Sequence, residues 1–128
     1  MNLHFARKLK YVFLLLALLF IAVLMVNCRS YEVKGGPVEE AELEDGIYRG
    51  TSRYGPVRVA VDVTIKDHFI TEIELVRHFH GRGREAEGPV IESILRQQST
   101  DVDAVTGATG SSIAIMNAVE EAVGKARK

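Results

Sequence analysis

Residues 57–66 have the sequence Val-Arg-Val-Ala-Val-Asp-Val-Thr-Ile-Lys, in which every odd position carries a branched apolar side chain. A period of two places these apolar side chains on one face of a β-strand and the intervening residues on the other. The stretch therefore predicts a strand with one buried face. It is the clearest strand in the chain, and the neighbouring elements can be arranged around it.

A second strand is predicted directly after a turn at Lys66-Asp67-His68. Residues 69–76 are rich in β-branched side chains, which strands favour, so the two strands form a hairpin. Strict alternation would place four side chains on the same face of this second strand: Phe69, Thr71, Ile73 and Leu75. Tyr48 and its neighbours supply a third strand.

Two helices are predicted after the hairpin. Pro89 is a favourable first helical position for one of them. Its expected buried stripe is Val90, Ile91, Ile94 and Leu95. The second follows Ser111 and Ser112 as candidate caps, with Glu120 and Glu121 turned outward. Its apolar stripe is Ile113, Met116, Val119 and Val123. The predicted fold class is α+β, a small antiparallel sheet packed with two helices.

Length and charge limit what the chain can be. It has 128 residues, of which the first thirty or so are dominated by an apolar segment, so the remainder forms one small domain. The formal net charge is -1 and the isoelectric point is near 6.4, so there is no general basic field. Aromatic residues make up 7% and tryptophan is absent, which disfavours a base-stacking surface. We expect no nucleic-acid partner.

The N-terminal segment indicates a membrane location. Three basic residues, Arg7, Lys8 and Lys10, precede an apolar run from Tyr11 to Val26. A helix from Tyr11 to Cys28 would be roughly 27 Å long, close to the ~30 Å hydrocarbon core of a bilayer. Because the residues after the run are acidic, the positive-inside tendency places the N-terminus in the cytoplasm and the domain outside. We expect a transmembrane anchor or an export signal over residues 1–30.

Cys28, the only cysteine, directly follows the apolar run. Its position resembles that of the lipid-modified cysteine of bacterial lipoproteins, although the preceding Met-Val-Asn departs from the small residues usual there. Lipidation is therefore the second choice after an uncleaved single-pass helix. Residues 31–44 are acidic, include Gly35, Gly36 and Pro37, and lack an apolar period, which predicts a linker to a domain over residues 45–128.

The stretch most informative about function is Asp103-Ala104-Val105-Thr106-Gly107-Ala108-Thr109. It presents a threonine hydroxyl between small residues at the entrance of a predicted helix, where backbone amides favour a phosphate. Gly107 and Gly110 permit backbone turns closed to other residues. A phosphate-binding loop would need a lysine after its second glycine, and a hydrolase elbow needs Gly-x-Ser-x-Gly; neither pattern is present. The local chemistry suits an anionic ligand.

The pattern Asp-x-x-Ser/Thr-Gly-Ala-Thr resembles the flavinylation motif of FMN-binding domains, such as the peripheral flavin subunits of Rnf-type and sodium-translocating quinone reductase complexes. The resemblance extends to Asp45-Gly46-Ile47-Tyr48-Arg49-Gly50-Thr51 and to Ser99-Thr100-Asp101-Val102-Asp103, in the same order. It covers nearly everything after the N-terminal segment. The turn at Lys66-Asp67-His68 lacks the glycine that is common in the family.

The resemblance implies a bacterial flavoprotein with FMN in phosphoester linkage to Thr109. A separate flavin transferase would deliver the FMN from FAD and recognise Asp103, Thr106, Gly107 and Ala108. The implied role is electron carriage between redox partner proteins or within a quinone-linked complex, rather than turnover as a stand-alone enzyme. Two other classes stay open. The chain could bind FMN non-covalently as a sensor or enzyme domain, or it could be a membrane-tethered scaffold without cofactor.

A basic loop precedes the first predicted helix. Two histidines one residue apart, His78 and His80, would share a strand face, but no third ligand has a recognisable spacing, so we expect no metal. Arg82 and Arg84 of the same loop would supply positive charge near the flavin or to an acidic partner.

Overall fold

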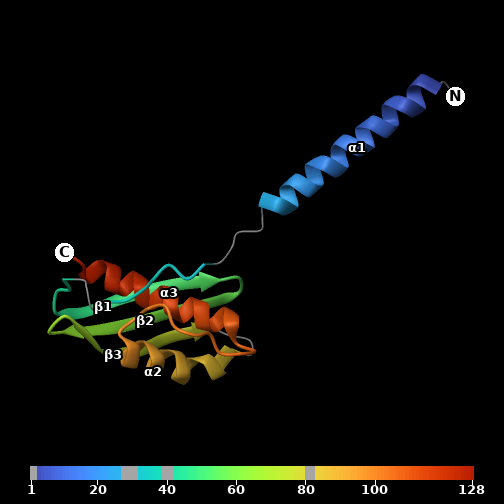
Figure 1. Cartoon of the computed structure of the whole chain (residues 1–128). Helices are drawn as coiled ribbons and strands as arrows, with labels where there is room; N and C mark the ends of the chain where they lie inside the picture. The colour runs from blue at the N-terminus through green and yellow to red at the C-terminus, as the bar shows by residue number, and fades with distance from the viewer. Residues whose placement is uncertain (1–2, 27–31, 39–41, 80–82) are drawn as a thin grey trace. The chain divides into compact units, whose positions relative to one another are not determined.

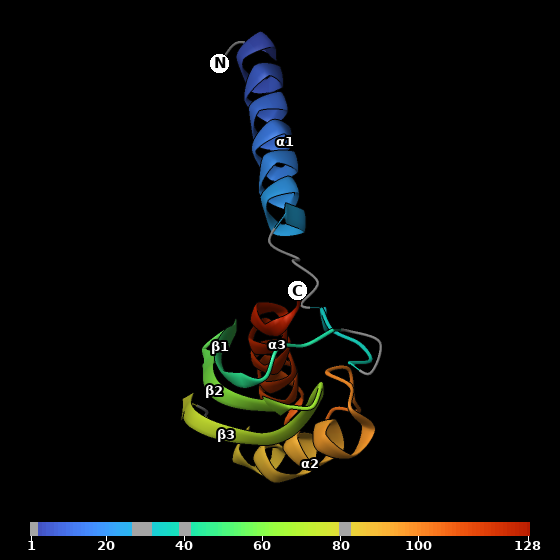
Figure 2. The same cartoon turned by 90° about the vertical axis from the view of Figure 1, so that its left-hand side faces the viewer.

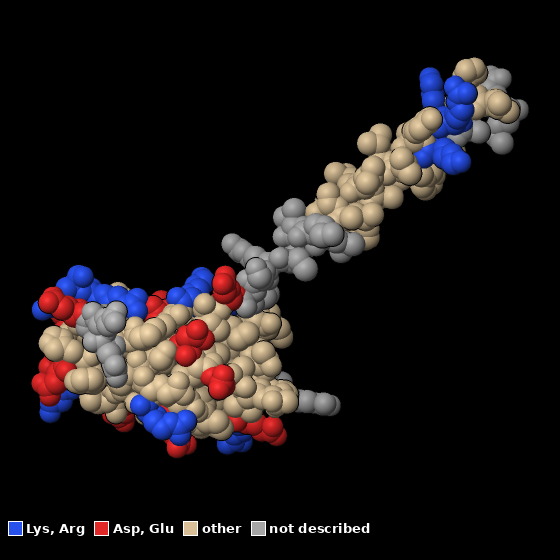
Figure 3. All heavy atoms as spheres, in the orientation of Figure 1, with Lys and Arg blue, Asp and Glu red and all other residues tan. Residues whose placement is uncertain are grey.

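The computed structural model describes residues 3–26, 32–38, 42–79 and 83–128 (Figure 1). The chain divides into two compact units, residues 1–30 and residues 31–128. The first unit contains one helix, α1 (Leu3–Val26), with basic side chains near its start and uncharged side chains along much of its described length (Figure 3). Within the described residues, no helix has both the length and the apolar character that crossing a membrane requires.

The second unit is built on a three-stranded antiparallel sheet in the order β1 (Gly46–Tyr54), β2 (Val57–Lys66) and β3 (Phe69–Phe79). The predicted alternation in β2 is confirmed, since its side chains from Val59 to Ile65 at odd positions are buried. The turn between β2 and β3 has no glycine, yet both Asp67 and His68 have positive φ. The hydrogen bond between His68 Nδ1 and the Leu43 carbonyl, 2.8 Å long, holds this turn against the domain.

The sheet curves around α3 (Thr109–Ala126), which packs on β1 and β2 (Figure 2). A short 3-10 helix, η1 (Gly83–Ala86), leads into α2 (Glu87–Gln97), which packs on β3 and α3. The predicted α+β arrangement of a small sheet and two helices is confirmed. Pro89 is the third residue of α2 rather than its first, because η1 carries the chain into the helix earlier.

The contact between α3 and β1 depends on Gly50. A Cβ at this position would lie 1.8 Å from the carbonyl oxygen of Ala118, which no side chain can tolerate. The helix backbone therefore approaches the strand backbone directly. This close approach brings the predicted apolar stripe of α3 into the core; Met116, Val119 and Val123 are fully buried.

Two β-bulges in β3 change which of its side chains face the core. Thr71 and Val76 are the extra residues, because Ile70 and Glu72 pair with consecutive residues of β2, as do Leu75 and Arg77. The predicted grouping of Phe69, Thr71, Ile73 and Leu75 on one face is therefore wrong at its start: Ile70 is buried with Ile73, whereas Phe69 and Thr71 are exposed. Each bulge shifts the alternation by one residue, a change that composition alone does not reveal.

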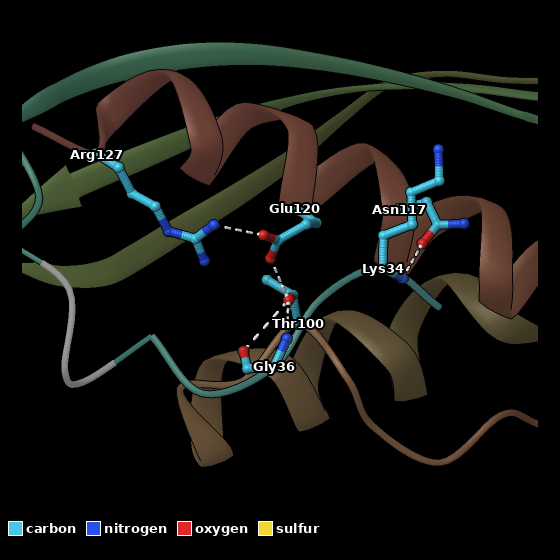
Figure 4. A network of polar contacts seen from close by, with 6 residues as sticks. All are labelled: Lys34, Gly36, Thr100, Asn117, Glu120 and Arg127. Atoms are coloured by element: carbon cyan, nitrogen blue, oxygen red, sulfur yellow. Dashed lines mark hydrogen bonds and ion pairs between the residues drawn. The ribbon is translucent and has the colours of Figure 1, made fainter. Parts of the chain in front are cut away.

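The segment predicted to be a linker instead packs on the domain where the structure describes it. Val38 and Leu43 are each only 1% exposed and belong to the core. Figure 4 shows Thr100, which is buried, between the segment and α3: its hydroxyl accepts the Gly36 N–H at 3.0 Å and lies 2.5 Å from Glu120 Oε2. Glu120 therefore faces this contact rather than solvent, contrary to the sequence prediction. An acidic, glycine-containing segment can pack on a domain when a few of its apolar side chains, here Val38 and Leu43, are buried in the core.

Candidate functional site

The hydroxyl group of Thr109, the last residue of the motif, lies where helix α3 begins. Thr109 is the first residue of α3 and is exposed, as are Asp103, Thr106 and Gly107 of the loop before it. Ala108 is the exception, being 5% exposed, and it anchors the loop to the core. The structure thus places four of the five predicted site residues on one exposed loop and helix end, where another protein can reach them.

Gly107 supplies the turn that aims the loop into α3. Its φ is +83°, in the left-handed region that L residues rarely adopt. A Cβ at this position would meet no atom within 4 Å. The glycine is therefore needed for its backbone conformation, and the space beside it is open to a ligand.

Ser111 and Ser112 do not cap α3, contrary to the sequence prediction; they lie inside its first turn and are buried. The Ser112 hydroxyl accepts the Val105 N–H at 3.0 Å and donates to the Ala108 carbonyl at 2.9 Å. A serine often bonds to the carbonyl four residues earlier in a helix. Here this bond also ties the loop back onto the helix, which fixes the backbone on the N-terminal side of Thr109.

The N-terminus of α3 fits a phosphate group. The first N–H groups of any helix lack intrahelical acceptors, and Ala108 offers no side-chain cap for them. The helix dipole adds partial positive charge at the same end. An exposed threonine hydroxyl, free helix-end amides and the open space at Gly107 together form a cradle suited to a phosphate on Thr109.

A buried histidine holds this helix end against the sheet. The side chain of His78, at the end of β3, is 2% exposed. Its Nδ1 lies 2.8 Å from Glu87 Oε1 at the start of α2, and its Nε2 lies 3.0 Å from Ser111 Oγ. Because a carboxylate only accepts hydrogen bonds, Nδ1 donates to Glu87, while Nε2 lies within hydrogen-bond distance of the Ser111 hydroxyl. The imidazole thereby joins β3, α2 and α3 two residues from Thr109.

The order Glu87, His78, Ser111 is that of a catalytic triad, but the serine is not placed for catalysis. Ser111 is 2% exposed and faces the core side of α3. A nucleophile must reach a substrate carbonyl, which this burial prevents. The three side chains therefore act as a clamp on the helix end, a role that sequence reasoning missed because the Val76 bulge turns His78 inward.

Tyr54 completes the surroundings of the helix end from β1. A Cβ on Gly110 would lie 3.1 Å from the Tyr54 ring, so the aromatic ring packs on the residue next to Thr109. Arg84 is exposed on η1, which packs against α3. His80 and Arg82 lie outside the described residues. Within those that are described, no three side chains are grouped as a metal site would need.

Comparison with known proteins identifies the family of this domain. A sequence model of the FMN-binding domain matches residues 54–124, which contain β2, β3, α2, the motif loop and most of α3. An uncharacterized protein of Treponema pallidum (strain Nichols) is 33% identical over 96 residues, covering 73% of this chain and 26% of that protein. The chain thus spans about a quarter of the length of this relative. The match covers more than half of the chain and includes Thr109, and the chain belongs to the FMN-binding domain family.

Proposed function

We propose that this chain is a membrane-tethered, extracytoplasmic electron carrier with FMN in phosphoester linkage to Thr109. The observation that carries the proposal is the exposed Thr109 hydroxyl at an uncapped helix N-terminus. Family membership supports FMN as the group bound there. When bound, FMN supplies reversible one-electron and two-electron chemistry.

The covalent step is a transfer from FAD catalysed by a separate flavin transferase. Thr109 Oγ attacks the FMN phosphorus of FAD, the bond to the AMP phosphate breaks, and AMP leaves while the hydroxyl proton is released. The Thr109, Gly110 and Ser111 amides at the start of α3 would hold the negative charge of the phosphodiester. The bond removes dissociation, which matters for a domain located where free flavin is scarce.

The exposed part of the motif serves recognition by the transferase. Asp103, Thr106 and Gly107 are all accessible, whereas Ala108 is buried and holds the loop in place. We assign the first three to direct contact with the transferase and Ala108 to positioning. Redox partner proteins or a quinone-linked complex would then exchange electrons with the attached flavin.

The membrane tether is α1. Arg7, Lys8 and Lys10 precede its apolar run, and acidic residues follow it, a charge asymmetry that supports an N-terminus in the cytoplasm and a domain outside. Attachment through lipid on Cys28 is the alternative, and it would leave the domain at the same membrane face. Cleavage-site mapping by N-terminal sequencing of the exported protein separates the two.

The test is the intact mass of the full chain after co-expression with an exported flavin transferase. The wild-type chain and Thr109→Ser should gain the mass of FMN less one water, and Thr109→Ala should not. Thr71→Ala, which removes an exposed hydroxyl from β3, is the matched control and should be modified normally.

Other results would change the assignment. Flavin that is lost on denaturation of the wild-type chain would indicate a non-covalent sensor or enzyme domain. A colourless, unmodified chain, obtained while the transferase modifies another substrate, would overturn the carrier proposal and leave the scaffold.

A further inference from the structure

Three arginines meet on the outer face of the sheet, the face turned away from α3. Arg53 of β1 and Arg58 of β2 are direct cross-strand partners. Arg77 of β3 pairs with Ala60, the next outward position of β2. Within the described residues, none of the three has a carboxylate partner; Arg53 Nε donates only to the Gly55 carbonyl, at 3.1 Å. We call these three side chains, with Phe79, the arginine surface.

Elsewhere on this outer face, an arginine is paired with a carboxylate. Arg49 donates to Asp62 through Nε and Nη2 at 2.7 and 2.6 Å, and these hydrogen bonds hold the pKa of Asp62 below its ordinary value. Like charges placed directly opposite each other on neighbouring strands destabilise a sheet. The Arg53 and Arg58 pair carries that cost without internal compensation, so an external anionic group would relieve it.

The arginine surface is hollowed. Two adjoining hollows of about 410 and 420 Å³ share Arg58 and Arg77 in their walls. Their other lining residues are Thr51, Ser52, Arg53, Pro56, Val59, Ala60 and Phe79. Phe79 lines one of the hollows and is 67% exposed as a residue. Exposed aromatic and arginine side chains around a concave surface are typical of the central contacts of protein interfaces.

The surface lies on the strand ends that also support the flavin site. Alternation along β1 turns Tyr54 toward Gly110 while Arg53 points outward. Along β3, His78 points to Ser111 while Arg77 and Phe79 point outward. A molecule bound to the arginine surface would therefore sit one sheet thickness from the helix end that carries Thr109.

We infer that the arginine surface binds the acidic face of a redox partner protein. The inference rests on the proposed carrier function, which requires such a partner. A flat anionic membrane fits less well, because the exposed Glu72 and Glu74 lie on the same outer face of β3 and would approach the lipid as well. A protein with a protruding cluster of carboxylates can contact the arginines and avoid these glutamates.

The test measures binding of an acidic plant-type [2Fe–2S] ferredoxin to the full chain in detergent by calorimetry. Arg58→Gln/Arg77→Gln should weaken binding by about tenfold or more at low salt, the size of effect expected from lost electrostatic complementarity. Salt should weaken binding of the wild-type chain more than that of the double variant. The matched control is Arg49→Gln, which removes an arginine already paired within the same face and should change the Kd by less than about twofold.

Three results would overturn the inference. They are equal affinity of wild type and double variant, an equal loss with Arg49→Gln, or protection of residues 53–58 from hydrogen exchange by phosphatidylserine nanodiscs and not by ferredoxin. Binding is measured on both the FMN-loaded chain and Thr109→Ala. An unmodified wild-type chain that still binds ferredoxin through Arg58 and Arg77 would reject the carrier function while supporting the surface.

Discussion

His78 Nε2 lies 3.0 Å from Ser111 Oγ, so a side chain at the end of β3 holds the first turn of α3 against the sheet. The same ring is held on its other side by Glu87, 2.8 Å from Nδ1. Replacing His78 by alanine leaves a buried serine hydroxyl without its partner. We expect a loss of about 1–3 kcal/mol in the free energy of unfolding, the usual cost of an unsatisfied buried polar group.

The same variant should also slow FMN attachment at Thr109, because the helix end is no longer fixed. The control is His68→Asn, which alters a histidine hydrogen bond at a turn of the sheet remote from α3's first turn and keeps a residue that tolerates positive φ. Thermal melting and the time course of the mass increase are measured for both. If both variants, at matched loss of stability, are modified at the same rate, His78 has no positioning role.

Gly107 should be required for its backbone conformation rather than for its small size. Gly107→Ala has free space but a φ of +83°, so it should cost about 1–2 kcal/mol and reduce the yield of modified protein. Gly107→Asn is larger, yet it tolerates this conformation better and should recover part of the yield. Intact mass spectrometry after a fixed time of co-expression measures both. A higher yield for alanine than for asparagine would contradict the conformational explanation.

Replacing a glycine by alanine should have opposite effects on stability at two positions, Gly50 in the close contact between α3 and β1 and Gly124 in open space on α3. Gly50→Ala places a Cβ 1.8 Å from the Ala118 carbonyl and should destabilise the domain by about 3 kcal/mol or more. Gly124→Ala, on α3 in open space, should stabilise it by about 0.5–1 kcal/mol because alanine favours helix. Chemical denaturation of the two variants in parallel provides the comparison. Similar stability for the two would mean that the strand and helix are not in direct backbone contact.

Glu121 ties α3 to β1 and should add a small pH dependence to stability. Burial raises its pKa, but the Thr51 N–H and hydroxyl and the Lys125 ammonium outweigh this effect and hold the pKa below its ordinary value. A lowered folded-state pKa stabilises the protein above the unfolded-state value, and this stability is lost as pH falls through the folded-state value.

The Glu121→Gln variant should therefore be less stable than wild type at neutral pH by up to about 1 kcal/mol, since the side chain is 43% exposed and water screens its charge. The difference should shrink as the pH falls below about 4.3, the ordinary value for glutamate. Urea denaturation at a series of pH values measures this, with the exposed Glu92→Gln as control. A difference that does not vary with pH would assign the effect to packing.

The sequence was sufficient for the elements that follow a simple period. The alternation in residues 57–66 predicted β2, and the apolar spacing predicted the buried stripes of α2 and α3. The motif ending at Thr109 placed the candidate attachment residue beside a helix start. These predictions succeeded because each depends on side chains that are close in sequence.

The remaining features depend on contacts between distant residues. A bulge is set by how two strands pair, so the prediction that Phe69 shares a face of β3 with Ile73 was wrong. The segment before β1 resembled a linker because the Thr100 hydroxyl that binds Gly36 lies 64 positions away. Serine is a residue type preferred at helix caps, but Ser111 is buried and bonds to His78, which comes from another element.

The extra residue Val76 gives β3 its final alternation, with His78 inward and Arg77 and Phe79 outward. One inserted residue thereby determines both the support of the helix end and the charge of the outer face. Removing it would move a guanidinium into the core and leave the imidazole in water, whereas removing two residues would preserve the pattern. Relatives that keep both features should therefore differ in the length of this hairpin by an even number of residues. An insertion or deletion of an odd number of residues would indicate that one of the two features has been lost.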